Sequence, residues 1–92
     1  MAHVRVRHRV NDYATWRAAF EAGAERRARA GEVSARVFQL SENSNHVIGL
    51  FEWDSLDNAK HYFEGAELQK AMDAAGVPEA PDVYFLNEAG AP

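Results

Sequence analysis

Hydrophobic and polar residues alternate along residues 3–10, which predicts a β-strand. One face of this strand is built of valines apart from His8, and the other face carries His3 and three arginines. An imidazole in an aliphatic row is costly unless it meets a hydrogen-bond partner or a ligand. His8 is therefore the first candidate for a functional side chain.

A helical pattern follows the strand over residues 13–30. Asp12 is suited to cap this helix, and Trp16 and Phe20 lie one turn apart on its inner face. Gly31 suits the C-terminal cap. The strand and the helix thus bring one titratable ring and two aromatic rings together, which is how a small-molecule pocket begins.

Two further strands are predicted over residues 33–40 and 46–53, because the turn-forming residues 41–45 separate two strand-like runs. This arrangement is typical of a β-hairpin. The next segment has helical spacing again, with polar capping residues before it and a glycine inside it.

This second helix is capped by Asp54 or Ser55, and Gly65 interrupts it before it resumes. A fourth strand opens at residues 83–86, and residues 89–92 are expected to form a frayed tail. The element order is β-α-β-β-α-β. With right-handed crossovers it predicts an α+β, ferredoxin-like fold, in which both helices lie on one face of a four-stranded antiparallel sheet.

Both faces of the strand over residues 46–53 are largely apolar, although the helices can cover only one of them. A second copy of the sheet is the simplest cover for the other face. We therefore expect a homodimer that pairs through its sheet faces. At that junction some of the strand-one arginines are expected to pair with acidic residues (Arg5, Arg7 and Arg9 with Glu52, Asp82 or Glu88).

The chain of 92 residues is expected to form one domain over residues 1–92, and its 47% apolar content is that of a globular protein. It has no cysteine and neither a signal-like start nor a membrane-length apolar run, so a cytoplasmic location is expected. Eight arginines fall in residues 1–40 and ten acids in residues 41–92. Because both halves interleave in one sheet, these charges should offset each other, and nucleic-acid binding is not expected.

Three arginines lie in the last turns of the first helix, where cations favour the helix dipole and a solvated helix end is expected (Arg26, Arg27 and Arg29). The four histidines show no metal-ligand pair at helical spacing, and no phosphate loop, nucleophile elbow or paired-carboxylate motif is visible. The sequence therefore predicts neither a metal nor an organic cofactor.

His8 allows three interpretations: an acid, base or orienting donor in a pocket, a satisfied core histidine, or a metal or haem ligand. An ordinary pKa of ~6.5 would let it exchange protons near neutrality if it faces a cavity. The aromatic residues likewise either pack as core or line a flat cavity for an aromatic or polyketide-like ligand. A catalytic role predicts an open cavity of ~300 Å³ or more beside His8.

The chain resembles the dimeric α+β-barrel superfamily, which includes antibiotic-biosynthesis monooxygenases, haem-degrading oxygenases and small polyketide-cyclase-like proteins. The resemblance covers nearly the whole chain. Besides the element order, three segments carry it: Val6-Arg-His-Arg-Val10 with Asp12 and Trp16 after it, Phe51-Glu-Trp53-Asp, and Asp82-Val-Tyr-Phe-Leu86.

The resemblance implies a pocket inside each protomer, between the sheet and its helices. It places His8 at the polar strand-one position, Trp53 at the aromatic that closes strand three, and Tyr62 at a pocket position on helix two. Met72 falls where haem-degrading relatives carry their iron ligand, so haem is not expected.

The resulting hypothesis is a cofactor-independent, monooxygenase-like enzyme that deprotonates an aromatic or polyketide-type substrate. A non-oxidative cyclase or isomerase and a non-catalytic binding or structural dimer stay open as alternatives. The predicted catalytic residues are His8 and Tyr62. The predicted substrate-binding residues are Trp16, Phe20, Phe51, Trp53, Phe63, Met72 and Tyr84.

Overall fold

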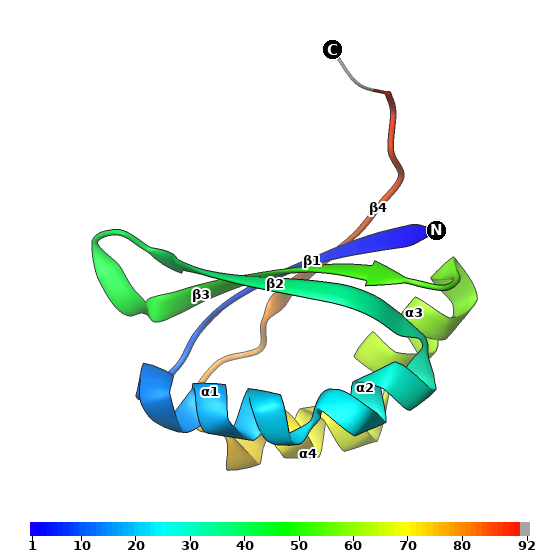
Figure 1. The fold of residues 1–92 in the computed structure, drawn as a ribbon. Coiled ribbons are helices and arrows are strands. Elements are labelled where there is room, and N and C mark those ends of the chain that lie inside the picture. Colours follow the sequence, from blue (N-terminus) through cyan, green and yellow to red (C-terminus); the bar gives the residue numbers. More distant parts are fainter. Residues whose placement is uncertain (91–92) are drawn as a thin grey trace.

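A computed structural model describes residues 1–90 of the chain, so residues 91–92 of the expected tail lie outside the described residues. The elements follow the order β1 (Ala2–Arg9), α1 (Tyr13–Ala22), α2 (Ala24–Ala30), β2 (Glu32–Leu40), β3 (Asn43–Trp53), α3 (Leu56–Phe63), α4 (Ala66–Ala74) and β4 (Asp82–Leu86). All the helices lie on one side of the sheet, and the chain after β4 projects away from the body (Figure 1).

The sheet has the strand order β2-β3-β1-β4, and each neighbouring pair is antiparallel. This is the predicted ferredoxin-like topology, and the prediction is confirmed. The register opposes His8 to Val47 and Val6 to both Gly49 and Val83. These residues therefore share the inner face, which the helices cover, and His8 lies in an aliphatic row as the alternation predicts.

The helix expected over residues 13–30 is in fact two helices, because the chain bends at Gly23 (φ −87°, ψ 2°). A Cβ atom at position 23 would lie only 2.9 Å from Nη2 of Arg26 and 3.2 Å from Nη1 of Arg27. The glycine thus makes room for two arginine side chains that fold back over the break. The predicted break at Gly65 is confirmed, and it separates α3 from α4.

Side-chain caps fix where the helices begin. Asp12 accepts a hydrogen bond from Thr15 N at 3.0 Å, and Ser55, rather than Asp54, accepts one from Asn58 N at 3.1 Å. The hairpin turn is shorter than expected, since β3 already begins at Asn43. None of the helices in the described part of the chain has the length and apolarity needed to cross a bilayer.

The core lies between the inner sheet face and the helices. Trp53 is fully buried there, and its indole Nε1 donates to Ala30 O at 2.9 Å, which ties β3 to the end of α2. Valines from β1 and β3 fill the rest of this layer, among them Val4 and Val47. The helical layer is therefore held against the sheet by large side chains at fixed positions.

The outer sheet face carries exposed apolar side chains from three strands, β2, β3 and β4: Phe38, Leu40, Leu50, Tyr84 and Leu86. The guanidinium of Arg5 lies 5.6 Å from the ring centre of Tyr84, and that of Arg36 lies 5.2 Å from the ring centre of Phe38. Within the chain, Arg9 forms an ion pair with Glu79 and Arg7 donates to His46. Pairing with Glu52, Asp82 or Glu88 across a dimer junction stays a prediction.

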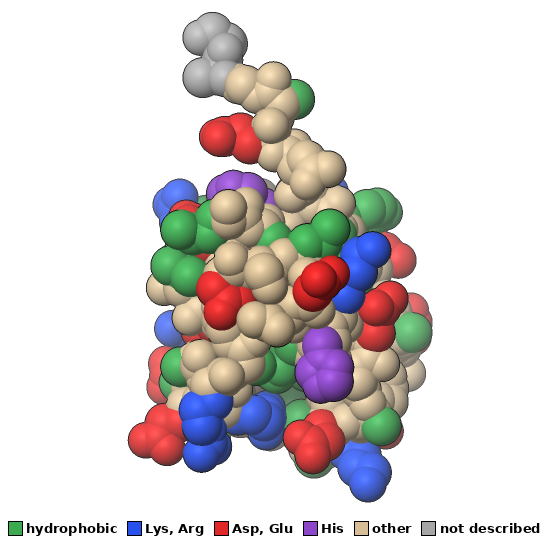
Figure 2. All heavy atoms as spheres, turned by 90° about the vertical axis from the view of Figure 1, so that its right-hand side faces the viewer, with side chains coloured by type: hydrophobic (Ala, Val, Ile, Leu, Met, Phe, Trp, Pro, Cys, Tyr) green, Lys and Arg blue, Asp and Glu red, His purple; other side chains and the backbone are tan. Residues whose placement is uncertain are grey.

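Acidic and basic side chains are interspersed over the side of the molecule seen in Figure 2. The basic first half and the acidic second half of the sequence are thus mixed by the fold, as the interleaved topology predicts.

Candidate functional site

A cavity of about 70 Å³ lies between the inner sheet face and the helices. Of the predicted site residues, seven line it: His8, Trp16, Phe20, Phe51, Tyr62, Phe63 and Met72. They come from β1, α1, β3, α3 and α4, so the fold gathers them from distant parts of the chain. The remaining lining residues are Val6, Ala19, Arg26, Arg27, Gly49, Leu68, Ala71 and Ala75.

Two side chains of this cavity wall, His8 and Arg26, have buried polar atoms without a hydrogen-bond partner within residues 1–90, and His8 is the one with both ring nitrogens in this state. Both of its ring nitrogens are buried, and neither has a hydrogen-bond partner within residues 1–90. Its ring centre lies 5.5 Å from that of Trp16. A satisfied core histidine would show a protein partner for at least one nitrogen, so the geometry favours a ring that is open to a ligand.

Burial, with a smaller contribution from the neighbouring imidazole of His46, lowers the pKa of His8 from 6.5 to about 4. The imidazole is therefore neutral near physiological pH, with one nitrogen able to donate and the other able to accept. The expected proton exchange near neutrality does not hold for the unliganded protein, because the aliphatic row removes water from the ring. An anionic ligand beside the ring would raise this pKa again.

Aromatic rings form most of the cavity wall. Trp16 stacks on Phe20 with ring centres 5.0 Å apart, and Phe63 lies 5.5 Å from Phe51 and 5.1 Å from Tyr62. The space over Gly49 is filled by the ring of Phe51, because a Cβ atom there would lie 2.7 Å from that ring. The absence of a side chain at Gly49 therefore lets the ring of Phe51 lie over the sheet at this position.

Two predicted site residues lie elsewhere. Tyr84 is opposite Arg5 in the β1–β4 register, which places it on the outer face, 49% exposed. Trp53 is on the inner face but packs at the far end of β3 against Tyr62 and Phe63. Neither side chain lines the cavity. Tyr84 therefore supplies no hydroxyl to this site, and Trp53 supports its wall from behind.

The cavity is smaller than the ~300 Å³ expected of a catalytic pocket and would hold about two water molecules. A surface depression of about 800 Å³ adjoins it and shares Arg26, Tyr62 and Leu68 with it. Helix α4, which supplies Leu68 and Met72, has no fully buried residue. A ligand that enters between α2 and α4 and is larger than about 70 Å³ therefore requires these side chains to move.

Two arginines of α2, which were expected to be solvated, belong to the cavity wall instead. Arg27 is buried: Nε donates to Glu32 Oε2 at 2.7 Å, Nη1 donates to Phe20 O at 2.6 Å, and the guanidinium lies 3.7 Å from the ring centre of Phe20. The helical spacing contained this signal, because eleven residues at 100° each bring Arg27 back to within about 20° of Trp16. The other arginine, Arg26, is half-buried.

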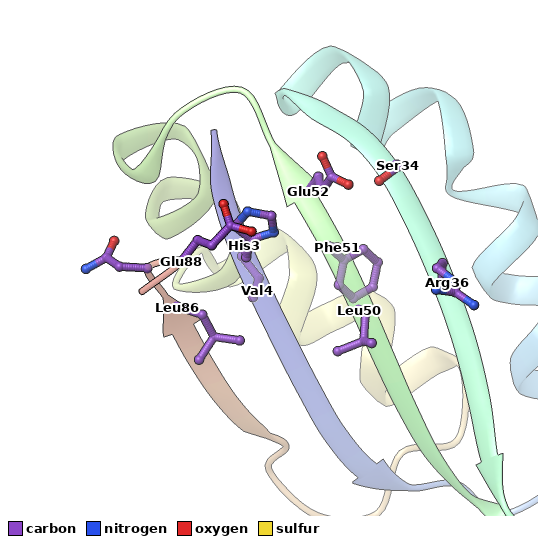
Figure 3. Close-up of a pocket in the computed structure, with 10 residues that line it drawn as sticks. His3, Val4, Ser34, Arg36, Leu50, Phe51, Glu52, Leu86 and Glu88 are labelled. Carbon is purple, nitrogen blue, oxygen red and sulfur yellow. The ribbon is translucent and has the colours of Figure 1, made fainter. Parts of the chain in front are cut away.

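A second hollow, of about 370 Å³, lies on the outer sheet face (Figure 3). Leu50, Leu86, His3 and Glu52 project into it from three strands, and Glu88 lies beside His3. It opens across the exposed apolar face that the sequence assigns to a dimer partner.

Among the described residues, His8 is the only one that brings an imidazole to the wall of the inner cavity. Within residues 1–90, no three His, Cys, Asp or Glu side chains gather in a way that could hold a metal ion. The thioether of Met72 lines the wall at the position that the resemblance assigns to an iron ligand.

No protein-family model and no curated protein sequence matches the chain. Solved structures do. SnoaB from Streptomyces nogalater, a cofactor-independent oxygenase, matches with a TM-score of 0.78 and 15% identity, over 98% of this chain and 94% of that one. ActVA-Orf6 of Streptomyces coelicolor, a monooxygenase solved with the ligand nanaomycin D, matches with a TM-score of 0.69 and 21% identity, over 98% and 88%.

A conserved protein from Methanosarcina mazei Go1 matches with a TM-score of 0.74 and 12% identity, over 95% of this chain and 91% of that one. At these identities the similarity concerns the fold. The chain therefore has the fold of antibiotic biosynthesis monooxygenase-like proteins, as the resemblance predicted.

Proposed function

We propose that this chain is a small-molecule enzyme that deprotonates an aromatic or polyketide-type substrate in the cavity beside His8, without a metal or organic cofactor. The unpartnered, buried imidazole of His8, facing a wall of aromatic rings, carries the proposal. The shared fold with a cofactor-independent oxygenase supports it.

In the proposed reaction, the neutral ring of His8 accepts a proton from an acidic C–H or phenolic O–H of the substrate. The enolate or phenolate and the imidazolium then stabilise each other as an ion pair in a site with little water. In this proposal the hydroxyl of Tyr62, a residue of the cavity wall, holds the developing oxyanion. The electron-rich carbon combines with O₂ to give a peroxide, which loses water and leaves a carbonyl group where a CH₂ group was.

Two alternatives keep the same cavity. A cyclase or isomerase would use the same deprotonation without O₂. A non-catalytic binding or structural dimer is favoured by the small volume of about 70 Å³. That class also predicts His8 hydrogen-bonded to protein, and within residues 1–90 its ring nitrogens have no such partner.

The proposal is tested with anthrone, whose CH₂ group is acidic and whose oxidation to anthraquinone consumes O₂. We expect O₂ uptake above the protein-free rate. The rate should fall at least about tenfold in the His8→Ala variant, because this variant lacks the general base. His3→Gln, on the opposite face of the same strand, is the matched control and should keep full activity.

Exchange of the anthrone CH₂ protons with heavy water separates the classes. Exchange with no O₂ uptake indicates the cyclase or isomerase. If the protein causes neither proton exchange nor O₂ uptake, the enzyme proposal is refuted. Full activity of His8→Ala would remove His8 from the mechanism while leaving the cavity in place.

We also propose that the chain forms a homodimer through its outer sheet face. The apolar side chains there come from β2, β3 and β4, and the hollow in Figure 3 opens across them. Leu50, 38% exposed, lies at the middle of this face and is flanked in register by Arg5 and Arg36.

Light scattering should therefore give twice the mass of one chain for the wild type and the mass of one chain for Leu50→Glu. The new carboxylate can pair with the flanking arginines inside one chain, so the fold should survive, but it would be buried at the junction. Leu56→Glu, at an exposed position on α3, is the control and should stay dimeric. A wild-type protein with the mass of one chain would contradict the dimer proposal.

A further inference from the structure

Arg26 occupies the boundary between the inner cavity and the surface depression, and it lines both. Its side chain folds back toward the break at Gly23, with Nη2 2.9 Å from the position that a Cβ atom would take there. The opening between α2 and α4 therefore has a guanidinium group on its wall.

In the part of the chain that the structure describes, this guanidinium has no anionic partner. The ion pairs within residues 1–90 are Arg9–Glu79, Arg17–Glu21 and Arg27–Glu32, and none includes Arg26. Its Nε is buried and makes no hydrogen bond within those residues. A buried donor on a charged group costs free energy unless something pairs with it, so Arg26 differs in kind from its neighbour Arg27, which is fully engaged.

The depression also contains two acidic side chains, Glu64 and Glu67, both exposed. Neither reaches Arg26 as an ion pair, and neither lines the inner cavity. Among the described residues, the cavity wall itself has Arg26 and Arg27 and no carboxylate, and Arg27 is already paired with Glu32, so the unpaired charge at the mouth of the cavity is the positive charge of Arg26.

From this geometry we infer that the ligand of this cavity is an aromatic carboxylate, with its ring against Trp16 and Phe20 and its carboxylate on Arg26 at the mouth. The inference rests on the proposed function, because both place a small aromatic molecule in the same cavity, and it adds the acidic group that selects the molecule. A planar carboxylate suits a guanidinium, since two parallel N–H donors can meet its two oxygens.

The test compares two probes of nearly equal size, para-hydroxybenzoate and para-hydroxybenzamide, titrated into the full-length labelled protein. The indole N–H signal of Trp16, which lines the cavity, reports binding by NMR, and that of Trp53, which does not line it, shows whether the fold is intact. The carboxylate should bind about tenfold more tightly than the amide, as expected for a charge-assisted hydrogen bond.

Arg26→Gln should abolish this preference and leave the affinity for the amide unchanged, and Arg26→Lys should restore part of it. Arg29→Gln is the matched control, because Arg29 lies on the same helix and borders the depression but not the cavity. Equal affinities in the wild type, or a preference that survives in Arg26→Gln, overturn the inference and leave the proposed function standing. If neither probe shifts Trp16, the inference and the proposed ligand site both fail.

Discussion

Replacing Glu32 by alanine is expected to lower the free energy of unfolding by about 3–5 kcal/mol, because it leaves the charge of Arg27 buried without a partner. The side chains of this ion pair are only 8% and 13% exposed, and the Nε–Oε2 distance is 2.7 Å. Nη1 of Arg27 also holds the carbonyl of Phe20 at 2.6 Å, so the damage would spread to the cavity wall. Urea unfolding followed by tryptophan fluorescence, at one fixed protein concentration, measures the change.

The exposed ion pair Arg17–Glu21 is the matched control. Its N–O distance of 2.8 Å is similar, but its side chains are 41% and 64% exposed, so Glu21→Ala should cost less than about 1 kcal/mol. The double variant Arg27→Met with Glu32→Leu should recover most of the lost stability, because it removes both charges and keeps the volume. Equal losses for Glu32→Ala and Glu21→Ala would show that burial of the first pair has no energetic consequence.

The fold could be predicted because its local sequence signals agree with its tertiary packing. The alternation in β1, the capping carboxylate of Asp12 and the glycine break at Gly65 each act over a few residues, and tertiary packing agrees with all of them. The break at Gly23 was missed because helical spacing continues across it. Two arginine side chains from the following turn pack against this glycine, and spacing alone does not contain that contact.

The candidate site was predicted only in part, and the reasons are particular to each residue. Seven predicted residues line the cavity because strand and helix periodicity fixed their faces. Tyr84 was predicted to bind substrate in the pocket between the sheet and the helices, but its register with Arg5 places it on the outer face. Arg27 fell on the Trp16 stripe but was assigned to solvent because of its charge, and the partner that permits its burial, Glu32, lies in the next element.

The volume of the cavity could not be predicted at all, because it depends on how closely α4 approaches the sheet. A shift of one side chain, such as Met72, changes a cavity of about 70 Å³ by a large fraction. The burial of His8 followed from its place on the valine-rich face of β1. Whether a hydrogen-bond partner reaches its ring depends on how closely the helices approach the sheet.

The folded protein is expected to lose stability as the pH falls from 6.5 to 4, by up to about 3 kcal/mol from His8 alone. Burial lowers the pKa of this ring in the folded state to about 4, and the unfolded chain retains the ordinary value of 6.5. Between these values the unfolded state binds a proton that the folded state does not, so acid favours unfolding. Above pH 6.5 both states are neutral at this position, and the full stability is present.

The measurement is urea unfolding at several pH values for the wild type and for His8→Gln, which keeps a polar side chain but cannot take up the proton. The difference between their free energies of unfolding should change by up to about 3 kcal/mol across this range, while other titrating groups cancel. An NMR titration of the His8 ring gives its folded-state pKa directly. A flat difference, with a ring that titrates near 6.5, would show that water or protein already satisfies the imidazole, and a ligand would then find no vacant acceptor there.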